Sequence, residues 1–140
     1  MLKKNKKDFR NLKKELLKPT KIYTKEILNL TKKNLINSAA HITGGGLIEN
    51  IIRSVPKNLD VNIDLSKIKT KKIFSWIKKN NISDSEMIKT FNCGVGFCLV
   101  IDKKNKKKIS KFFSKKYKPY EIGYLSNKKT KISITGKLKW

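Results

Sequence analysis

Three consecutive glycines, Gly44, Gly45 and Gly46, stand at the centre of "SAAHITGGGLIEN" (residues 38 to 50), after a short apolar run and before a helix-like stretch. A strand, a glycine loop and a helix in this order expose backbone N–H groups at a helix N-terminus, where the helix dipole adds about half a positive charge. Glycines let the backbone approach a phosphate without interference from Cβ atoms, and Thr43 adds a hydroxyl. The pattern is neither GxGxxG nor a P-loop. The spacing therefore leaves two interpretations open, an anion-binding loop and a turn that requires positive φ.

Polar residues flank this loop. His41 is the only histidine of the chain, and it is either a catalytic base or a polar residue near a strand end, because no serine or cysteine is identified as its nucleophile. Glu49 and Asn50 lie in the first turn of the next helix, where capping and compensation of the helix dipole are their simplest roles. Asp60 and Asp64 alternate with apolar residues in "LDVNIDLS", so we expect them on a solvated strand face. No metal site is predicted from these residues.

A second unusual stretch is "TFNCGVG", residues 90 to 96. We expect Gly94 and Gly96 to share one face at the start of a strand. Glycine inside a strand indicates the close approach of a ligand or another backbone, or a bulge. Tight packing against the first glycine loop or a neighbouring helix is the alternative, and spacing does not separate these interpretations.

The composition fits a single domain with a hydrophobic core. The chain has 140 residues, is 38% hydrophobic and carries a formal net charge of +25. Of its 35 basic residues only Arg10 and Arg53 are arginine, although arginine is favoured for reading bases and for bidentate phosphate contacts. A compositional bias toward lysine therefore explains the charge better than a dedicated nucleic-acid surface, and we expect only weak, salt-sensitive binding to polyanions.

The two cysteines and the hydropathy pattern bear on location. Cys93 and Cys98 are five positions apart in a strand-like run, so we expect them to point to opposite faces, which argues against a mutual disulfide and a shared metal. Two thiols fit a reducing cytosol, and no apolar run reaches the ~18 residues of a membrane span. We therefore expect a cytoplasmic protein without a membrane segment.

Hydrophobic periodicity predicts the elements that position these residues. Ser83 and Glu86 have the spacing of a capping box. The apolar run at 95 to 101 predicts a central strand covered on both sides. Together the elements predict an α+β fold in which helices pack on a mixed sheet. Helices are expected at 21–36, 47–55, 70–79, 83–90 and 103–118, and strands at 38–42, 59–65, 95–101, 120–125 and 131–135.

Three stretches together resemble one known family: "LLKPTKIY" (16 to 23), "AHITGGGLIENIIRSVP" (40 to 56) and "EMIKTFNCGVG" (86 to 96). Their order and spacing are similar to the C-terminal domain of phosphoribosylformylglycinamidine cyclo-ligase, also called AIR synthetase. The resemblance spans about residues 16 to 125. It implies a basic N-terminal segment at 1–16 and an AIR synthetase C-terminal-like domain at 17–140. By this resemblance we expect the family's N-terminal domain and the first strand–helix unit of its C-terminal domain to be missing from this chain. We therefore expect an open sheet edge and marginal solubility unless a partner supplies the strand.

The resemblance implies a role in purine biosynthesis. The family enzyme uses ATP and Mg²⁺ to activate the formyl oxygen of formylglycinamidine ribonucleotide, and ring closure gives 5-aminoimidazole ribonucleotide, ADP and phosphate. It works as a cytoplasmic homodimer. By resemblance His41 is a candidate catalytic residue. The candidate phosphate- or substrate-binding residues are Thr43, Gly44, Gly45, Gly46, Glu49, Asn50, Asn92, Gly94 and Gly96.

The same resemblance sets a limit on this chain. We expect no complete site for ATP or Mg²⁺ in it, because the family's carboxylates for both lie in the N-terminal domain. Activity is expected to require that domain or a separately encoded half. Two alternatives stay open, a non-enzymatic basic module that binds nucleic acid and an inactive gene remnant.

Overall fold

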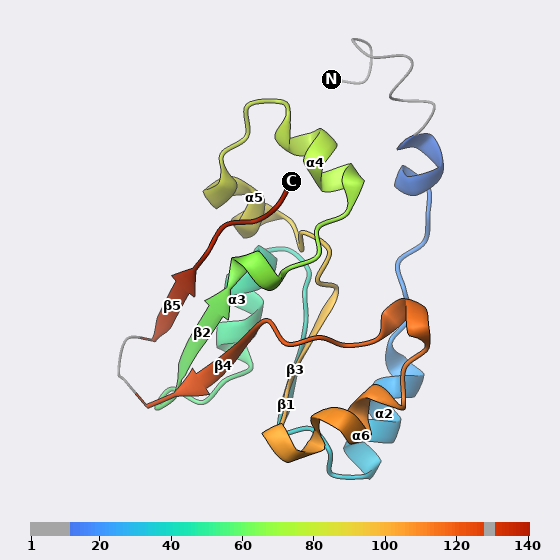
Figure 1. Cartoon of the computed structure of the whole chain (residues 1–140), viewed down its shortest axis with the longest axis vertical. Helices are drawn as coiled ribbons and strands as arrows, with labels where there is room; N and C mark the ends of the chain where they lie inside the picture. The colour runs from blue at the N-terminus through green and yellow to red at the C-terminus, as the bar shows by residue number, and fades with distance from the viewer. Residues whose placement is uncertain (1–11, 128–130) are drawn as a thin grey trace.

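The computed structural model describes residues 12–127 and 131–140 and shows a mixed arrangement of short helices and strands (Figure 1). The α-helices are α2 (Thr24–Lys32), α3 (Gly46–Arg53), α4 (Lys72–Lys78), α5 (Asp84–Thr90) and α6 (Lys106–Ser110), and residues 12–16 are also helical. The 3₁₀ turns are η2 (Leu65–Lys67), η3 (Lys103–Asn105) and η4 (Lys115–Tyr117). The strands are β1 (Ser38–His41), β2 (Asp60–Asp64), β3 (Phe97–Val100), β4 (Gly123–Ser126) and β5 (Ile132–Thr135).

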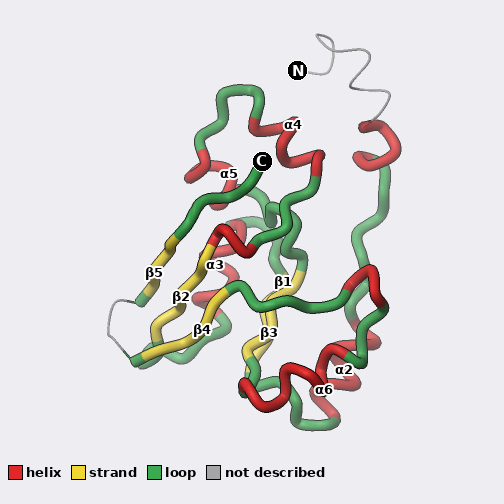
Figure 2. Tube along the Cα trace, viewed as in Figure 1, coloured by secondary structure: helices red, strands yellow, loops and turns green. Residues whose placement is uncertain are grey.

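The described strands form two small sheets, so the expectation of one mixed sheet is wrong (Figure 2). β1 and β3 make an antiparallel pair in which His41 lies opposite Phe97. β2 is the middle strand of the second sheet and runs antiparallel to β4 and parallel to β5. The second sheet is mixed, as expected. Alternation in the sequence shows which segments are strands, but the pairing order depends on tertiary packing that alternation does not contain.

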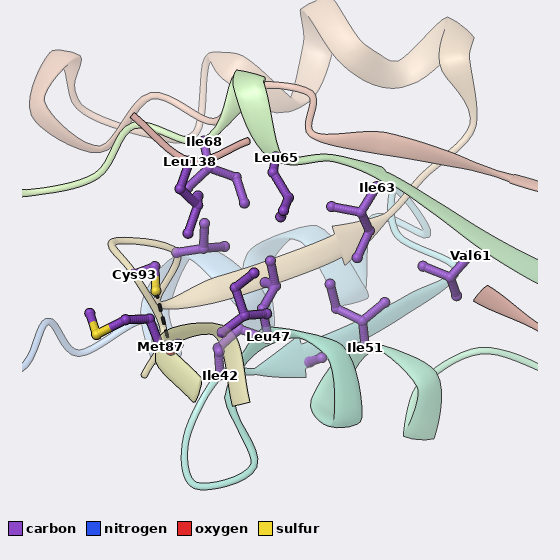
Figure 3. Close-up of a cluster of buried hydrophobic side chains, with 13 residues drawn as sticks. Ile42, Leu47, Ile51, Val61, Ile63, Leu65, Ile68, Met87, Cys93 and Leu138 are labelled. Carbon is purple, nitrogen blue, oxygen red and sulfur yellow. Dashed lines mark hydrogen bonds between the residues drawn. The ribbon is translucent and has the colours of Figure 1, made fainter. Parts of the chain in front are cut away.

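The main hydrophobic core lies between the second sheet and helices α3 and α5 (Figure 3). Leu47 and Ile51 of α3 face Val61 and Ile63 of β2, and all four side chains are buried. Met87 of α5 is completely buried at one end of this cluster. Burying one such side chain contributes about 1.5–3 kcal/mol, so this core fixes the position of α3 and with it the glycine loop.

A second, smaller cluster joins α2 to α6. Leu30, Leu35 and Ile109 are buried there, and Leu99 of β3 packs against them. The neighbouring strand residue Cys98 packs against the main core instead. Since β3 lies between the main core and the smaller cluster, both of its faces are apolar. It is not the central strand that we expected, since in the described part of the chain it pairs only with β1.

Three further expectations are wrong. The predicted helix at 103–118 is divided into η3, α6 and η4, in keeping with the repulsion between lysines three and four positions apart. Asp60 is buried rather than solvated, and its carboxylate accepts a hydrogen bond from the N–H of Lys131 at 2.8 Å. Cys93 lies in the turn before β3 with φ 49°, so strand alternation does not apply to it, and both free cysteines contact the main core.

Other local predictions are confirmed. Ser83 caps α5, because its hydroxyl accepts a hydrogen bond from the N–H of Glu86 at 3.1 Å. The carboxylate of Glu86 accepts from the Thr90 hydroxyl, at 3.0 Å. The strand at β1, the helix at α3 and the alternating strand at β2 lie where the sequence places them.

Candidate functional site

The glycine loop connects β1 to α3, as the sequence predicts. Gly45 is the N-cap residue of α3 with φ 88°, and Gly46 begins the helix with φ 63°. No side chain caps this helix end. The Gly46 N–H donates to the Thr43 carbonyl at 3.1 Å. The neighbouring amides of a helix N-terminus lack partners within the helix itself, so this N-terminus is able to donate hydrogen bonds to an anion.

The three glycines serve different purposes. Gly44 has an ordinary φ, and a Cβ atom added to it would meet nothing within 4 Å. A Cβ atom on Gly45 would meet the flexible carboxylate of Glu49. A Cβ atom on Gly46 would overlap the backbone carbonyl of Ile88 in α5. Two of the three glycines are therefore needed for structural reasons. Gly46 lets α3 pack closely on α5, and Gly45 adopts the positive φ that the turn requires.

Asn50 braces the loop from one turn into α3. Its side-chain amide donates to the carbonyl oxygens of Gly46 at 2.7 Å, Gly44 at 3.1 Å and Thr43 at 3.4 Å. These bonds hold the carbonyls on one side of the loop. Glu49 is exposed and pairs with Arg53 at 3.1 Å, so it lies at the rim of the loop and has little structural role there.

The second glycine stretch forms a compact turn beside the first. The side chain of Asn92 accepts a hydrogen bond from the N–H of Gly94 at 3.0 Å, and its carbonyl accepts from Val95 at 2.8 Å. Gly94 has φ 103°, and a Cβ atom there would lie 2.7 Å from the carbonyl oxygen of Lys69. Gly94 and Gly96 both precede β3, so the expectation that they share a strand face is wrong.

One backbone hydrogen bond joins the two glycine stretches. The N–H of Ile42 donates to the carbonyl of Gly96 at 3.1 Å, directly beyond the β1–β3 pair. The two predicted motifs, 50 residues apart in the chain, are therefore neighbours at one end of this pair (Figure 1).

His41 is exposed at the same end and belongs to an aromatic cluster. Its ring stacks on Phe97 with centroids 5.6 Å apart and planes 21° apart, and it meets the edge of Tyr23 at 6.0 Å. Tyr23 also lies 5.1 Å from Phe97. The sequence predicts Tyr23 inside a helix at 21–36 and does not single out Phe97, because the strand register that brings them to His41 is not visible in the sequence.

An open, mostly apolar groove of about 500 Å³ lies beside this cluster. It is bounded by His41 and Phe97 on one side and by residues 20–24, Ile27 and Leu28 on the other. Lys21 also lines this groove. Its ammonium group lies 2.5 Å from the Glu26 carboxylate and 5.0 Å from the centroid of the Tyr23 ring. The hydrogen bond from Lys21 holds the pKa of Glu26 below its usual range, and burial raises the pKa of the Tyr23 hydroxyl.

The described residues provide no metal centre. No three of their His, Cys, Asp and Glu side chains are grouped so that they could hold an ion. Among residues 12–127 and 131–140 there is likewise no helix with the length and apolar character that a membrane crossing requires.

Comparisons with known proteins identify one family. Residues 1–135 match the family described as AIR synthase related protein, C-terminal domain. The chain is 47% identical over 90 residues to the phosphoribosylformylglycinamidine cyclo-ligase of Staphylococcus epidermidis. The aligned stretch is 64% of this chain and 26% of that protein. It is 37% identical over 123 residues to the Staphylococcus aureus protein of the same name, which covers 86% of this chain and 36% of that protein.

A longer relative shows the same match. The trifunctional purine biosynthetic protein adenosine-3 of Bos taurus is 46% identical over 87 residues, which is 61% of this chain and 9% of that protein. The chain thus spans between 9% and 36% of the length of these curated relatives. The family match over residues 1–135 includes both glycine stretches and extends beyond residues 16 to 125, over which the sequence resembles the family.

Proposed function

The chain belongs to the family of AIR synthase related proteins, C-terminal domain, and from this premise we propose that it supplies one wall of a cyclo-ligase active site. The reaction is the ATP-dependent ring closure of formylglycinamidine ribonucleotide to 5-aminoimidazole ribonucleotide. The observation that carries the proposal is the hydrogen bond between Ile42 and Gly96. It joins two glycine stretches at an uncapped helix N-terminus with His41 exposed beside them.

The residues of this wall have distinct proposed roles. The Gly45 N–H, at the N-cap of α3, binds a phosphate group of the substrate or of the transferred phosphoryl group, with the Thr43 hydroxyl as a further donor. The Gly46 N–H instead donates to the Thr43 carbonyl at 3.1 Å and closes the turn. Positioning and electrostatic stabilisation are most of what phosphoryl transfer requires of a protein. The His41 imidazole lies where it could hold or move a proton of the reacting amidine. Asn50 holds the loop carbonyls away from the bound anion.

The second glycine stretch completes the proposed wall. Asn92 and Gly94 form a turn held by their own hydrogen bond, and Gly96 anchors that turn to the first loop. The Glu49 carboxylate lies beside Gly45 and pairs with Arg53, and its proposed role is a contact with the substrate at the rim of the loop. When bound, ATP supplies the phosphoryl group that turns the formyl oxygen into a leaving group.

The rest of the proposed enzyme lies outside these residues. We propose that ATP and Mg²⁺ are held by a further domain, on the same polypeptide or a separate one, and that this domain covers the sheet edge where the family places its first strand–helix unit. A cytoplasmic homodimer is proposed on the same grounds. The family match does not favour the nucleic-acid-binding alternative, and binding to nucleic acid is proposed to be non-specific only.

A reconstitution experiment tests the proposal at the level of single residues. The part of the Staphylococcus aureus cyclo-ligase that this chain does not match is co-expressed with the chain, and formation of 5-aminoimidazole ribonucleotide is measured. Gly45→Val should abolish turnover while the protein stays folded, because a branched side chain at φ 88° disturbs the amides of the loop. Gly44→Ala is the matched control and should retain activity. Equal turnover for Gly45→Val and the parent would contradict the assigned loop.

A further inference from the structure

The aromatic cluster at His41 unites the three motif blocks of the sequence. Tyr23 ends the first block, "LLKPTKIY", His41 lies in the second, and Gly96 ends the third, directly before Phe97. Cross-strand pairing places His41 opposite Phe97, and Tyr23 reaches both rings from the start of α2. Contacts between aromatic rings at such distances stabilise the folded state beyond the area that they bury and favour one orientation of a ring.

Gly96 is the feature that admits Tyr23 to this cluster. Its φ lies outside the left-handed region, so the backbone conformation there does not require glycine. A Cβ atom on Gly96 would overlap the Tyr23 hydroxyl oxygen, and it would lie 3.1 Å from the ring carbon that bears this hydroxyl. The close approach that glycine indicated in the sequence is thus made by a side chain of the protein, and not by a ligand or another strand.

Tyr23 is itself firmly placed. It precedes α2 and its carbonyl accepts a hydrogen bond from Ile27 at 3.1 Å. The ammonium group of Lys21 lies over its ring and is held by Glu26. The same ammonium group lies 4.5 Å from the centroid of the Tyr117 ring, which ties η4 to this segment. These contacts leave the Tyr23 ring little freedom to turn away from His41.

We propose that Tyr23 is a positioning residue for His41. Its ring, seated over Gly96, packs together with Phe97 against the imidazole and fixes the orientation of the His41 ring. Tyr23 touches no reacting atom in this scheme and acts through His41. The effect on catalysis rests on the proposed cyclo-ligase function, whereas the effect on the orientation of His41 does not.

A compensating pair of substitutions tests the positioning directly. Because His41 is the only histidine, its ring protons are identifiable in the NMR spectrum of the whole chain, and ring currents of Tyr23 and Phe97 displace them. Gly96→Ala should move these resonances, because the new methyl group pushes the Tyr23 hydroxyl away. Tyr23→Phe alone should leave them nearly unchanged. The double variant Tyr23→Phe/Gly96→Ala should return them toward the parent positions, since only the 3.1 Å contact with the ring carbon then remains.

Catalysis provides a second readout. In the reconstituted enzyme Gly96→Ala should lower kcat by about 10- to 100-fold with little change in KM, since small displacements of a catalytic group carry costs of that size. The double variant should recover most of this loss. A residue with only a structural role would change the melting temperature without moving the His41 resonances or separating kcat from KM.

Two results would overturn the inference. One is a folded Tyr23→Leu variant in which the nuclear Overhauser contacts between the His41 and Phe97 ring protons keep their parent intensities, since loss of the Tyr23 ring current by itself moves the His41 resonances. The other is a double variant that keeps the full displacement caused by Gly96→Ala. Failure of the proposed cyclo-ligase function gives a different result, because the reconstituted parent then makes no product. The NMR measurements on His41 still decide in that case whether Tyr23 positions His41.

Discussion

Replacing Gly46 with alanine should destabilise the fold far more than the same change at Gly44. Gly46 has φ 63°, and a Cβ atom there would overlap the carbonyl oxygen of Ile88 and approach the carbonyl group of Lys89 to 2.8 Å. The left-handed conformation costs a non-glycine residue about 1–2 kcal/mol. Overpacking against a backbone that cannot rotate aside costs a further ~1–3 kcal/mol. The total of about 2–5 kcal/mol is a large part of the ~5–15 kcal/mol that stabilises an ordinary domain.

The cost arises at a contact that supports the whole core. To admit the methyl group, α3 must move away from α5, which loosens the packing of Leu47 and Met87 at that end of the cluster. Helix α3 also carries the glycine loop, so the loop should lose its position before the protein unfolds completely.

Urea denaturation of three single variants measures the effect. Gly44→Ala should stay within about 1 kcal/mol of the parent, because nothing lies within 4 Å of the added Cβ atom. Gly45→Ala should lose about 1–2 kcal/mol, the cost of its left-handed φ, since the carboxylate of Glu49 can move aside. An unchanged midpoint for Gly46→Ala, or equal losses for Gly44→Ala and Gly46→Ala, would refute this explanation of the triplet.

Three other properties should follow from the same structure. Asn50→Ala should lower the free energy of unfolding, measured in urea, by about 1–2 kcal/mol, because it removes three hydrogen bonds to loop carbonyls. It should also speed hydrogen exchange of the loop amides, and unchanged exchange would contradict the bracing role of Asn50. Burial raises the pKa of Cys93 to about 11 and of Cys98 to about 12, so both thiols should resist alkylation at pH 8 until urea is added. The free energy of unfolding should fall as pH rises above about 9, because only the thiols of the unfolded chain ionise there. Rapid alkylation of the folded protein would contradict the burial of these thiols. The lowered pKa of Glu26, caused first by the hydrogen bond from Lys21, contributes stability above pH ~4.5 that is lost as pH falls through the lower folded value. Glu26→Gln should flatten this acid limb of the stability curve, and an identical limb in the variant would contradict the assignment.

The sequence predicted features that depend on local patterns. Ser83 was found as a helix cap because the capping residue and its partner amide are three positions apart. The strand at β2 was found from its alternation, although burial of Asp60 was not, since the carboxylate is satisfied by the N–H of Lys131, 71 residues away. Local patterns thus give the elements but not their partners.

The candidate site shows the same division. The sequence identified His41 and both glycine stretches, and the structure brings these together through Ile42 and Gly96. It did not identify Tyr23 and Phe97 as neighbours of His41, because that contact depends on the register of β1 with β3 and on where α2 begins. The triplet also contained two kinds of glycine that spacing alone could not separate, one needed for packing on Ile88 and one that meets no neighbour.

Reconstitution of activity tests the central claim most directly. The 140-residue chain and the unmatched part of the Staphylococcus aureus cyclo-ligase are purified separately and mixed, and 5-aminoimidazole ribonucleotide is measured with ATP and formylglycinamidine ribonucleotide present. The proposed function predicts product only when both components are present, and none when the chain carries Gly45→Val. A stable, folded complex of the two components that forms no product would contradict the assignment of this chain to a cyclo-ligase active site.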